Sequence, residues 1–281
     1  MLSDRDFASW KLLPGGEEAF DLQGRQSDKS GSTWLTREEI DQLEKLPGLD
    51  TIRISGLRQD TFEYFISRYG RQMKRIFFWK CHLVEDWTML GSLQQAEYIY
   101  WFWNQRITRL WDLSANPHLV GLRLYDFTRL RSIAEIQGST SLRQLAVGDA
   151  IWARWEIDSL LPLAGMPLTY LAFEGKKILD NDLSFLPALR QLRRFDCALN
   201  IFTTEQFAWI AANCPQADGR AWHAVEDWGE GDQKKACILG KRKPILSYRQ
   251  HGERIRKYEQ AYEQLKEKYR GIPYHTAFPD G

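Results

Sequence analysis

Short apolar segments recur along the chain at a nearly constant interval. In the segment 96–104 the spacing is apolar-x-x-apolar-x-apolar, and the segment ends on Asn104. The central apolar position returns at steps of 24, 23, 23, 23, 26 and 24 residues, at Ile52, Ile76, Ile99, Leu122, Leu145, Leu171 and Phe195. A chance run of apolar residues would not keep this interval. We therefore expect one short strand in each unit, stacked on the strand of the next unit.

The segments between these strands predict how the chain returns from one strand to the next. Their apolar residues are spaced by three, as at Ile107, Leu110 and Leu113. This spacing favours short helical or 3₁₀ turns. Two segments, 60–69 and 204–212, have the length and pattern of full α-helices.

Each end of a stack exposes a core layer, so we expect a covering segment at both ends. At the N-terminal end, residues 1–45 combine scattered apolar residues with a short helix that begins at the capping box of Thr36 and Glu39. The repeats then cover residues 46–222, and residues 223–281 form the C-terminal cap.

The C-terminal cap itself shows three features. The apolar run Cys237–Leu239 predicts an edge strand that closes the stack. The segment Tyr248–Arg270 has apolar residues at steps of three and four, which is typical of one face of an amphipathic helix. The tail, residues 274–281, is expected to be loose.

The spacing L-x-x-L-x-L-x-x-N is the signature of leucine-rich repeats. Through the stretches WDLSANPHLVGL, KKILDNDLSFLPAL, FTTEQFAWI and GKRKPIL, the chain resembles bacterial leucine-rich repeat proteins of about this size that lack export signals. The return segments are also similar to those of internalins. The resemblance covers roughly residues 45–250. It implies an α/β solenoid of about seven to eight repeats, with a parallel β-sheet on the concave face and caps at both ends. It also implies a binding role, and it transfers no catalytic residue.

Composition narrows the class of function. The chain has 281 residues and a net charge of +1, which gives no global field that would attract nucleic acid or membranes. The start, MLSDRDFASW, has no secretory signal, and no apolar stretch has the length of a membrane span. The four cysteines form no C-x-x-C pair. We therefore expect reduced thiols in a cytoplasmic protein.

The residues between the apolar positions of each strand predict a binding surface. Side chains alternate along a strand, so these residues should point outward on strands about 4.8 Å apart. Aromatic residues and arginines, the residues of interface hot spots, gather there: Arg53, Arg75, Phe77, Trp79, Tyr98, Tyr100, Phe102, Arg123, Tyr125 and Tyr170. We call these ten residues the aromatic face and expect them to bind a protein partner. The alternative is that the rings stack on one another, or lie under the N-terminal segment, and only stabilise the sheet.

Two other features offer rival functions. From Gln233 to Arg270 the chain has 12 Lys/Arg and 4 Glu, which could hold phosphate groups or an acidic protein. A solvated helix face with ion pairs at helical spacing explains the same charges, and no nucleic-acid motif is present.

A cleft beside the C-terminal helix would suit an enzyme or a regulator of one. However, the histidines are scattered, and the adjacent Cys81 and His82 should point apart, so we expect no catalytic residue, cofactor or metal site.

The sequence thus favours a non-enzymatic protein of the bacterial cytosol that binds a protein partner through the aromatic face. A rigid curved surface lowers the ordering cost of binding, which suits this role. Within this class, the size of the chain and the rigid concave face suggest a regulatory or immunity-type protein that neutralises a toxin or effector.

Overall fold

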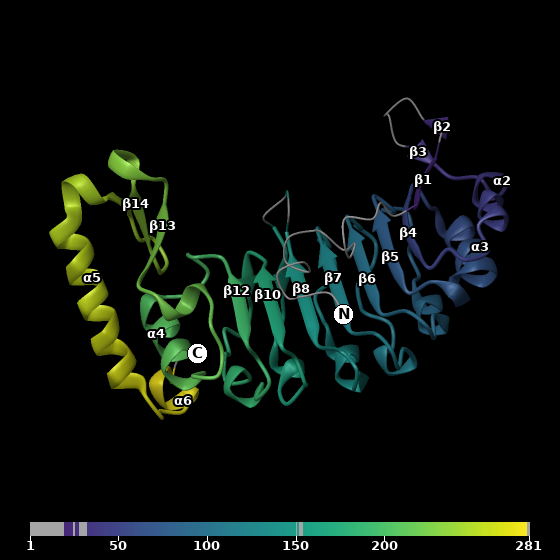
Figure 1. Cartoon of the computed structure of the whole chain (residues 1–281). Coiled ribbons are helices and arrows are strands. Elements are labelled where there is room, and N and C mark those ends of the chain that lie inside the picture. Colours follow the sequence, from purple (N-terminus) through teal and green to yellow (C-terminus); the bar gives the residue numbers. More distant parts are fainter. Residues whose placement is uncertain (1–19, 25, 28–32, 150, 152–153, 280–281) are drawn as a thin grey trace.

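A parallel sheet of eight strands forms the main part of the protein (Figure 1). The computed structural model describes residues 20–24, 26–27, 33–149, 151 and 154–279. The strands are β1 Phe20–Gln23, β4 Thr51–Ser55, β5 Arg75–Trp79, β6 Tyr98–Phe102, β7 Gly121–Tyr125, β8 Gln144–Gly148, β10 Tyr170–Glu174 and β12 Arg194–Cys197. They lie in the sheet in this same order. The α/β class and the parallel sheet expected from the sequence are confirmed.

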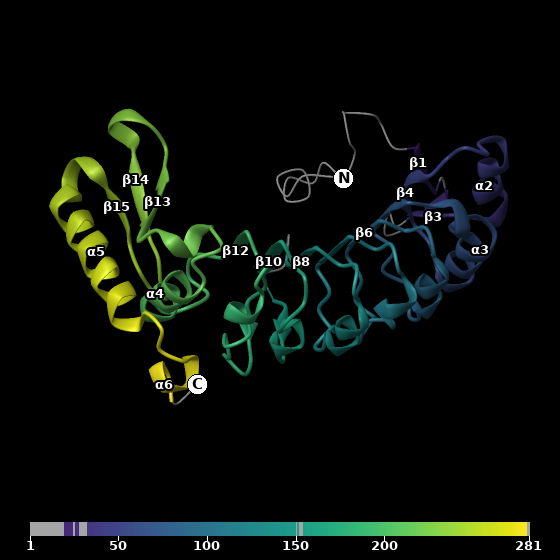
Figure 2. The same cartoon turned by 60° about the horizontal axis from the view of Figure 1, so that its bottom comes forward.

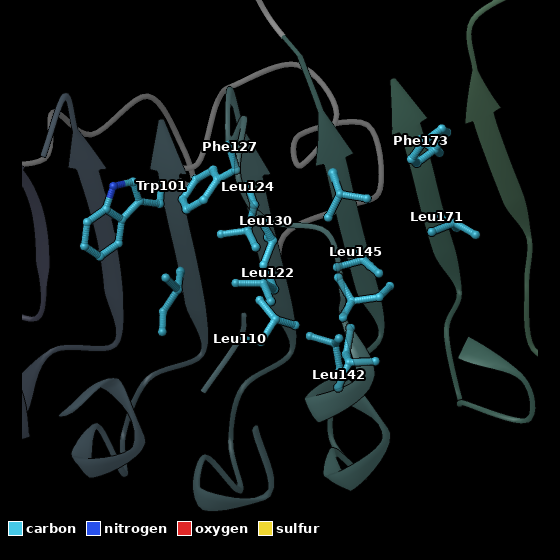
Figure 3. Packing of buried hydrophobic residues seen from close by; sticks show 14 of the residues in the cluster. Trp101, Leu110, Leu122, Leu124, Phe127, Leu130, Leu142, Leu145, Leu171 and Phe173 are labelled. Carbon is cyan, nitrogen blue, oxygen red and sulfur yellow. The ribbon is translucent and has the colours of Figure 1, made fainter. Parts of the chain in front are cut away.

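Neighbouring strands pair at the predicted apolar positions. Ile76 lies opposite Ile52 on one side and Ile99 on the other, and the same register continues through β12. Each of the predicted residues is no more than 1% exposed: Ile52, Ile76, Ile99, Leu122, Leu145, Leu171 and Phe195. We call these seven residues the inner column. Figure 3 shows part of it, with Leu122 and Leu145 on adjacent strands among further buried leucines.

The chain returns between strands mainly through 3₁₀ helices, as the spacing of three predicted. They are Asp41–Lys45, Gly70–Gln72, Thr88–Ser92, Leu113–Ala115, Ala134–Gly138, Leu161–Leu163 and Leu186–Ala188. A small parallel pair, β9 Glu156–Ile157 and β11 Lys177–Ile178, lies in two of these returns. The two predicted full helices are α3, Gln59–Tyr69, and α4, Thr204–Asn213. The views in Figures 1 and 2 place the strands along an arc with the 3₁₀ returns on its outer side.

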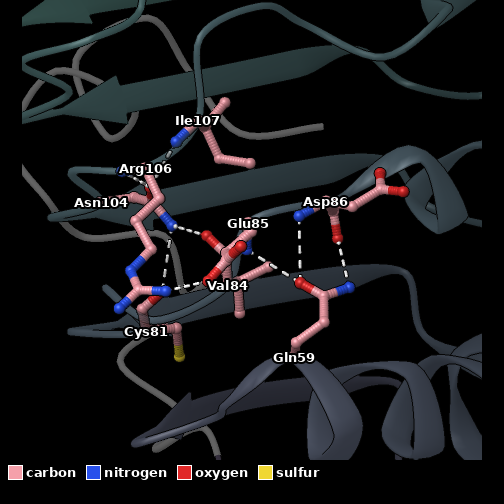
Figure 4. A network of polar contacts seen from close by, with 8 residues as sticks. All are labelled: Gln59, Cys81, Val84, Glu85, Asp86, Asn104, Arg106 and Ile107. Carbon is pink, nitrogen blue, oxygen red and sulfur yellow. Dashed lines mark hydrogen bonds and ion pairs between the residues drawn. The ribbon is translucent and has the colours of Figure 1, made fainter.

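Buried Asn104, the residue that ends the apolar pattern of β6, ties two successive turns together (Figure 4). Its Nδ2 donates to the carbonyls of Cys81 and Val84, at 3.1 and 2.9 Å. Its Oδ1 accepts from the backbone N–H groups of Arg106 and Ile107, at 2.8 and 3.0 Å. All four backbone groups are thereby satisfied where the chain leaves the strand, which is what a buried turn requires.

The N-terminal end of the sheet is formed by β1, whose residues pair with those of β4. A short antiparallel pair, β2 Gln26–Ser27 and β3 Thr33–Trp34, precedes helix α2, Arg37–Ile40. The predicted capping box is confirmed, because Thr36 Oγ1 accepts from Glu39 N at 3.3 Å and Glu39 Oε2 accepts from Thr36 N at 3.0 Å. Residues 1–19 of the expected N-terminal cap lie outside the described residues.

The C-terminal end carries a second sheet, of three antiparallel strands in the order β13-β14-β15. The strands are β13 Val225–Trp228, β14 Lys235–Ile238 and β15 Ile245–Ser247. Helix α5, Tyr248–Tyr269, packs on this sheet through Ile255. The expectation that Cys237–Leu239 closes the main sheet was wrong. Asp218 already occupies the outer edge of β12, accepting from Phe195 N and donating to Arg193 O, both at 2.9 Å.

The end of the chain is also more ordered than the sequence suggested. Tyr274, at the start of helix α6, Tyr274–Ala277, is buried. Its hydroxyl donates to Asn181 O at 2.5 Å and accepts from Gln206 Nε2 at 2.7 Å. Described residues 274–279 are therefore anchored to the main sheet's returns and to α4, and the expectation of a loose tail was wrong for them.

None of the helices among the described residues has both the length and the apolar character needed to cross a membrane.

Candidate partner-binding face

The strand register brings the residues of the aromatic face into rows. Phe77 of β5 lies opposite Tyr100 of β6, which lies opposite Arg123 of β7. A second row joins Trp79, Phe102 and Tyr125. The rows exist because every strand is paired in the same register, so residues at one repeat position become neighbours.

The rings in these rows stack on one another. The Phe77 and Tyr100 ring centroids are 4.2 Å apart with planes at 7°, and those of Trp79 and Phe102 are 4.3 Å apart at 22°. The Arg123 guanidinium lies 5.3 Å from the Tyr100 centroid and 4.6 Å from that of Tyr125. Each such contact contributes about 0.5–2 kcal/mol. The stacking that the sequence left as an alternative is therefore present.

The expectation that the whole aromatic face contacts water was wrong. Six of its ten residues are at most 2% exposed: Tyr98, Tyr100, Phe102, Arg123, Tyr125 and Tyr170. The rings among them form an apolar cluster separate from the main core, with Ala146 and Ala172. These six residues are a second core layer and offer no open binding surface.

The remaining four residues, Arg53, Arg75, Phe77 and Trp79, are half-buried and reach the surface at the β4–β5 end of the face. We call them the accessible edge. The Arg53 guanidinium lies 5.4 Å from the Phe77 centroid and 4.9 Å from that of Trp79. Arg53 also pairs with Asp21 of β1 at 3.4 Å, and its side chain remains 33% exposed. The accessible edge thus joins two aromatic rings to a partly desolvated cation.

Burial also sets the ionisation state of the tyrosines in the face. It raises the pKa values of Tyr100, Tyr125 and Tyr170 above the usual range. Their phenols are therefore neutral at physiological pH. The hydroxyl of Tyr125 donates to Glu174 Oε2 at 2.9 Å. Next to the accessible edge, the buried Arg123 guanidinium lies against the faces of the Tyr100 and Tyr125 rings.

A cleft of about 960 Å³ separates the end of the main sheet from the C-terminal sheet and α5. Its lining residues come from β12, the segment 218–224, β13 and α5: Arg193, Arg194, Asp196, Asp218, Gly219, Arg220, Trp222, His223, Ala224, Val225, Glu226, Asp227, Tyr248, Glu259 and Glu263. We call it the C-terminal cleft. Gly219 lets one wall pass close to β12, since its φ is +148° and a Cβ there would lie 2.1 Å from Phe195 O.

The described residues that line the cleft include no cysteine and one histidine, His223, whose Nε2 lies 3.9 Å from Asp218 Oδ1. Burial raises the pKa values of the Cys81 and Cys214 thiols to about 12 and also raises that of Cys197. Such thiols are poor nucleophiles. Within the part of the chain that the structure describes, no group of His, Cys, Asp and Glu side chains could hold a metal ion.

The adjacent pair Cys81 and His82 does point apart, as expected. Cys81 is buried and its Sγ donates to Ile54 O at 3.7 Å, whereas the centroid of the His82 ring lies 4.6 Å from that of Trp103, on which it stacks.

The basic region, residues 233–270, is a surface whose charges are partly paired. On α5, Lys266 pairs with Glu263 at 2.9 Å, at helical spacing.

Comparison with models of protein families and with curated proteins finds no match for this chain.

Proposed function

We propose that the chain is a leucine-rich-repeat-type solenoid of the bacterial cytosol that binds a partner protein and catalyses no reaction. The repeat interval, the common register of the inner column and the 3₁₀ returns support this assignment of the fold. The buried Asn104, which bonds to two successive turns, supports it further. In such a fold the aromatic face is the concave face.

The binding site that we propose is the accessible edge of that face. The observation that carries the proposal is that Phe77 and Trp79 are partly exposed yet stacked on the buried rings of Tyr100 and Phe102. Rings fixed in this way lose little conformational entropy when a partner covers them. Arginine beside tryptophan, as at Arg53 and Trp79, is the composition of residues that dominate interface energies.

A charged border supports the same site. Asp21 flanks the accessible edge beside Arg53, and Glu97 lies 3.8 Å from Arg75. An aromatic centre surrounded by solvated charges is the usual anatomy of a protein–protein interface, in which the border excludes water and sets orientation. Neutralisation of a toxin or effector is the role within this class that we propose.

The experiment places a photoreactive phenylalanine analogue at Phe77 and illuminates the protein in bacterial cytosol. The matched control carries the analogue at Leu179, which is also apolar and 42% exposed but lies outside the aromatic face. Mass spectrometry of the products should identify one protein crosslinked from position 77 and absent from position 179. Equal crosslinking of the same proteins from both positions would contradict the proposed site.

A further inference from the structure

The C-terminal cleft contains the free edge of a β-strand. Four successive residues, Ala224, Val225, Glu226 and Asp227, line the cleft, and three of them belong to β13. Among the strands that the structure describes, β13 pairs with β14 alone, so its second edge carries no described strand. A short exposed edge strand is a template on which an extended peptide can add by main-chain hydrogen bonds.

The phase of the β13–β14 ladder identifies the backbone groups at this edge. Leu239 N donates to Ala224 O at 3.1 Å, so this pair of residues is hydrogen-bonded. Hydrogen-bonded and non-bonded pairs alternate along an antiparallel ladder. The next bonded pair on β13 is therefore at Glu226, and the N–H and C=O groups of Val225 and Asp227 point away from β14. Among the described residues, no backbone hydrogen bond reaches these groups.

The charges around this edge define the peptide that fits. The lining holds six carboxylates and three arginines, a difference of −3. Two arginines are already paired within the cleft, Arg194 with Asp196 at 2.7 Å and Arg220 with Glu226 at 3.1 Å. Lys234 and Lys266, from outside the lining, pair with Asp227 and Glu263, so the six carboxylates face five cations in all, and the excess is one negative charge.

After these pairs are counted, two lining carboxylates remain without a lysine or arginine partner in the described structure. They are Glu259 of α5 and Asp218, whose Oδ1 lies 3.9 Å from His223 Nε2 and whose backbone forms a β-bridge with Arg194. Charged residues on an edge strand normally prevent association with other strands. The acidic side chains along β13 and on the opposite walls repel an acidic segment. They attract a basic segment instead.

We propose that the C-terminal cleft binds an extended basic segment of a partner protein, which adds as a strand to the open edge of β13. Main-chain groups of Val225 and Asp227 supply up to four hydrogen bonds to it. Glu259 and Asp218 receive its lysine or arginine side chains. The inference deepens the proposed protein-binding role and adds a second contact site, well separated along the sheet from the accessible edge.

The test uses the full chain and a fluorescein-labelled peptide, KVKVKVK, with fluorescence anisotropy as the readout. The basic peptide should bind and the acidic peptide EVEVEVE should not. Methylation of alternate backbone nitrogens in the basic peptide should weaken binding at least about tenfold, because one edge of the peptide then has no donors. Equal binding of both peptides, or binding that ignores methylation, would overturn the inference.

Two protein variants locate the site. Val225→Pro removes an N–H that points into the cleft and leaves the β14 ladder intact, so it should abolish binding with little change in melting temperature. Glu259→Lys should weaken binding of the basic peptide several-fold, whereas Glu267→Lys, on the same helix outside the cleft, should not. Retained affinity in both cleft variants would refute the site. Because the probe is a synthetic peptide, this result is independent of crosslinking at Phe77, and either proposal can fail alone.

Discussion

Replacing Asn104 by Ala tests the account of the buried turn. The change removes four hydrogen bonds, two donated by Nδ2 and two accepted by Oδ1. A net contribution of about 1 kcal/mol per bond gives about 4 kcal/mol. The N–H of exposed Arg106 can regain a bond to water, whereas the buried carbonyls of Cys81 and Val84 regain less. We therefore expect the free energy of unfolding to fall by about 2–4 kcal/mol.

Asn200 provides the matched control. It ends the last repeat as Asn104 ends the β6 repeat, but it is exposed. Asn200→Ala should change the free energy of unfolding by less than about 0.5 kcal/mol. Urea denaturation followed by tryptophan fluorescence measures both variants. Equal destabilisation by the two changes, or a loss below about 1 kcal/mol for Asn104→Ala, would refute the role given to this side chain.

Three further predictions concern the core and its titratable groups. Leu145→Ala in the inner column should lower the free energy of unfolding by about 2–5 kcal/mol, and a loss below 1 kcal/mol in urea denaturation would exclude the register. Because burial raises the pKa values of Tyr100, Tyr125 and Tyr170, the unfolded chain releases these protons first. Their contribution to stability should be complete below about pH 10 and decrease as the pH rises further, which urea denaturation between pH 8 and 11 measures. A thiol reagent at pH 8 should modify half-buried Cys237 first, and it should reach buried Cys81, Cys197 and Cys214 only after unfolding. Fast reaction of all four thiols in the folded protein would contradict this order.

The periodic part of the fold was predictable because each unit repeats the same physical requirement. A strand with apolar residues at fixed positions must cover the strand beside it, so the spacing of Ile52, Ile76 and Ile99 sets the register directly. Helix α3 and the capping box at Thr36 follow from equally local patterns. Where the repeat ends, such signals stop. The apolar run at Cys237 predicts a strand but not which sheet it joins.

The candidate site was predictable in position but not in exposure. Alternation correctly placed Phe77 beside Tyr100 on one side of the sheet. It cannot tell a solvated face from a covered one, since rings that face outward also bury one another. The hydrogen bonds of Asn116 were missed as well, although its Oδ1 accepts from Trp111 Nε1 at 2.7 Å. The available signal was an Asn five residues after a Trp in the stretch WDLSAN.

The open edge of β13 was outside the reach of the sequence for a similar reason. The apolar run Cys237–Leu239 predicts one short strand, but the phase of the ladder depends on which residues pair. That pairing follows from tertiary packing on α5, through Ile255 and its neighbours. The cleft likewise depends on how two separate sheets are placed.

Under the proposed function Trp79 contacts the partner, whereas buried Tyr100, stacked beside Phe77, only supports the neighbouring rings. The most direct measurement is the dissociation constant of the partner crosslinked at Phe77, for Trp79→Ser and Tyr100→Ser, alongside the free energy of unfolding of each variant. Trp79→Ser should weaken binding by about 2 kcal/mol or more, roughly 30-fold, and should lower stability less than Tyr100→Ser does. Tyr100→Ser should instead lower stability by about 3–5 kcal/mol. An unchanged dissociation constant for a folded Trp79→Ser variant would exclude Trp79 from the binding site.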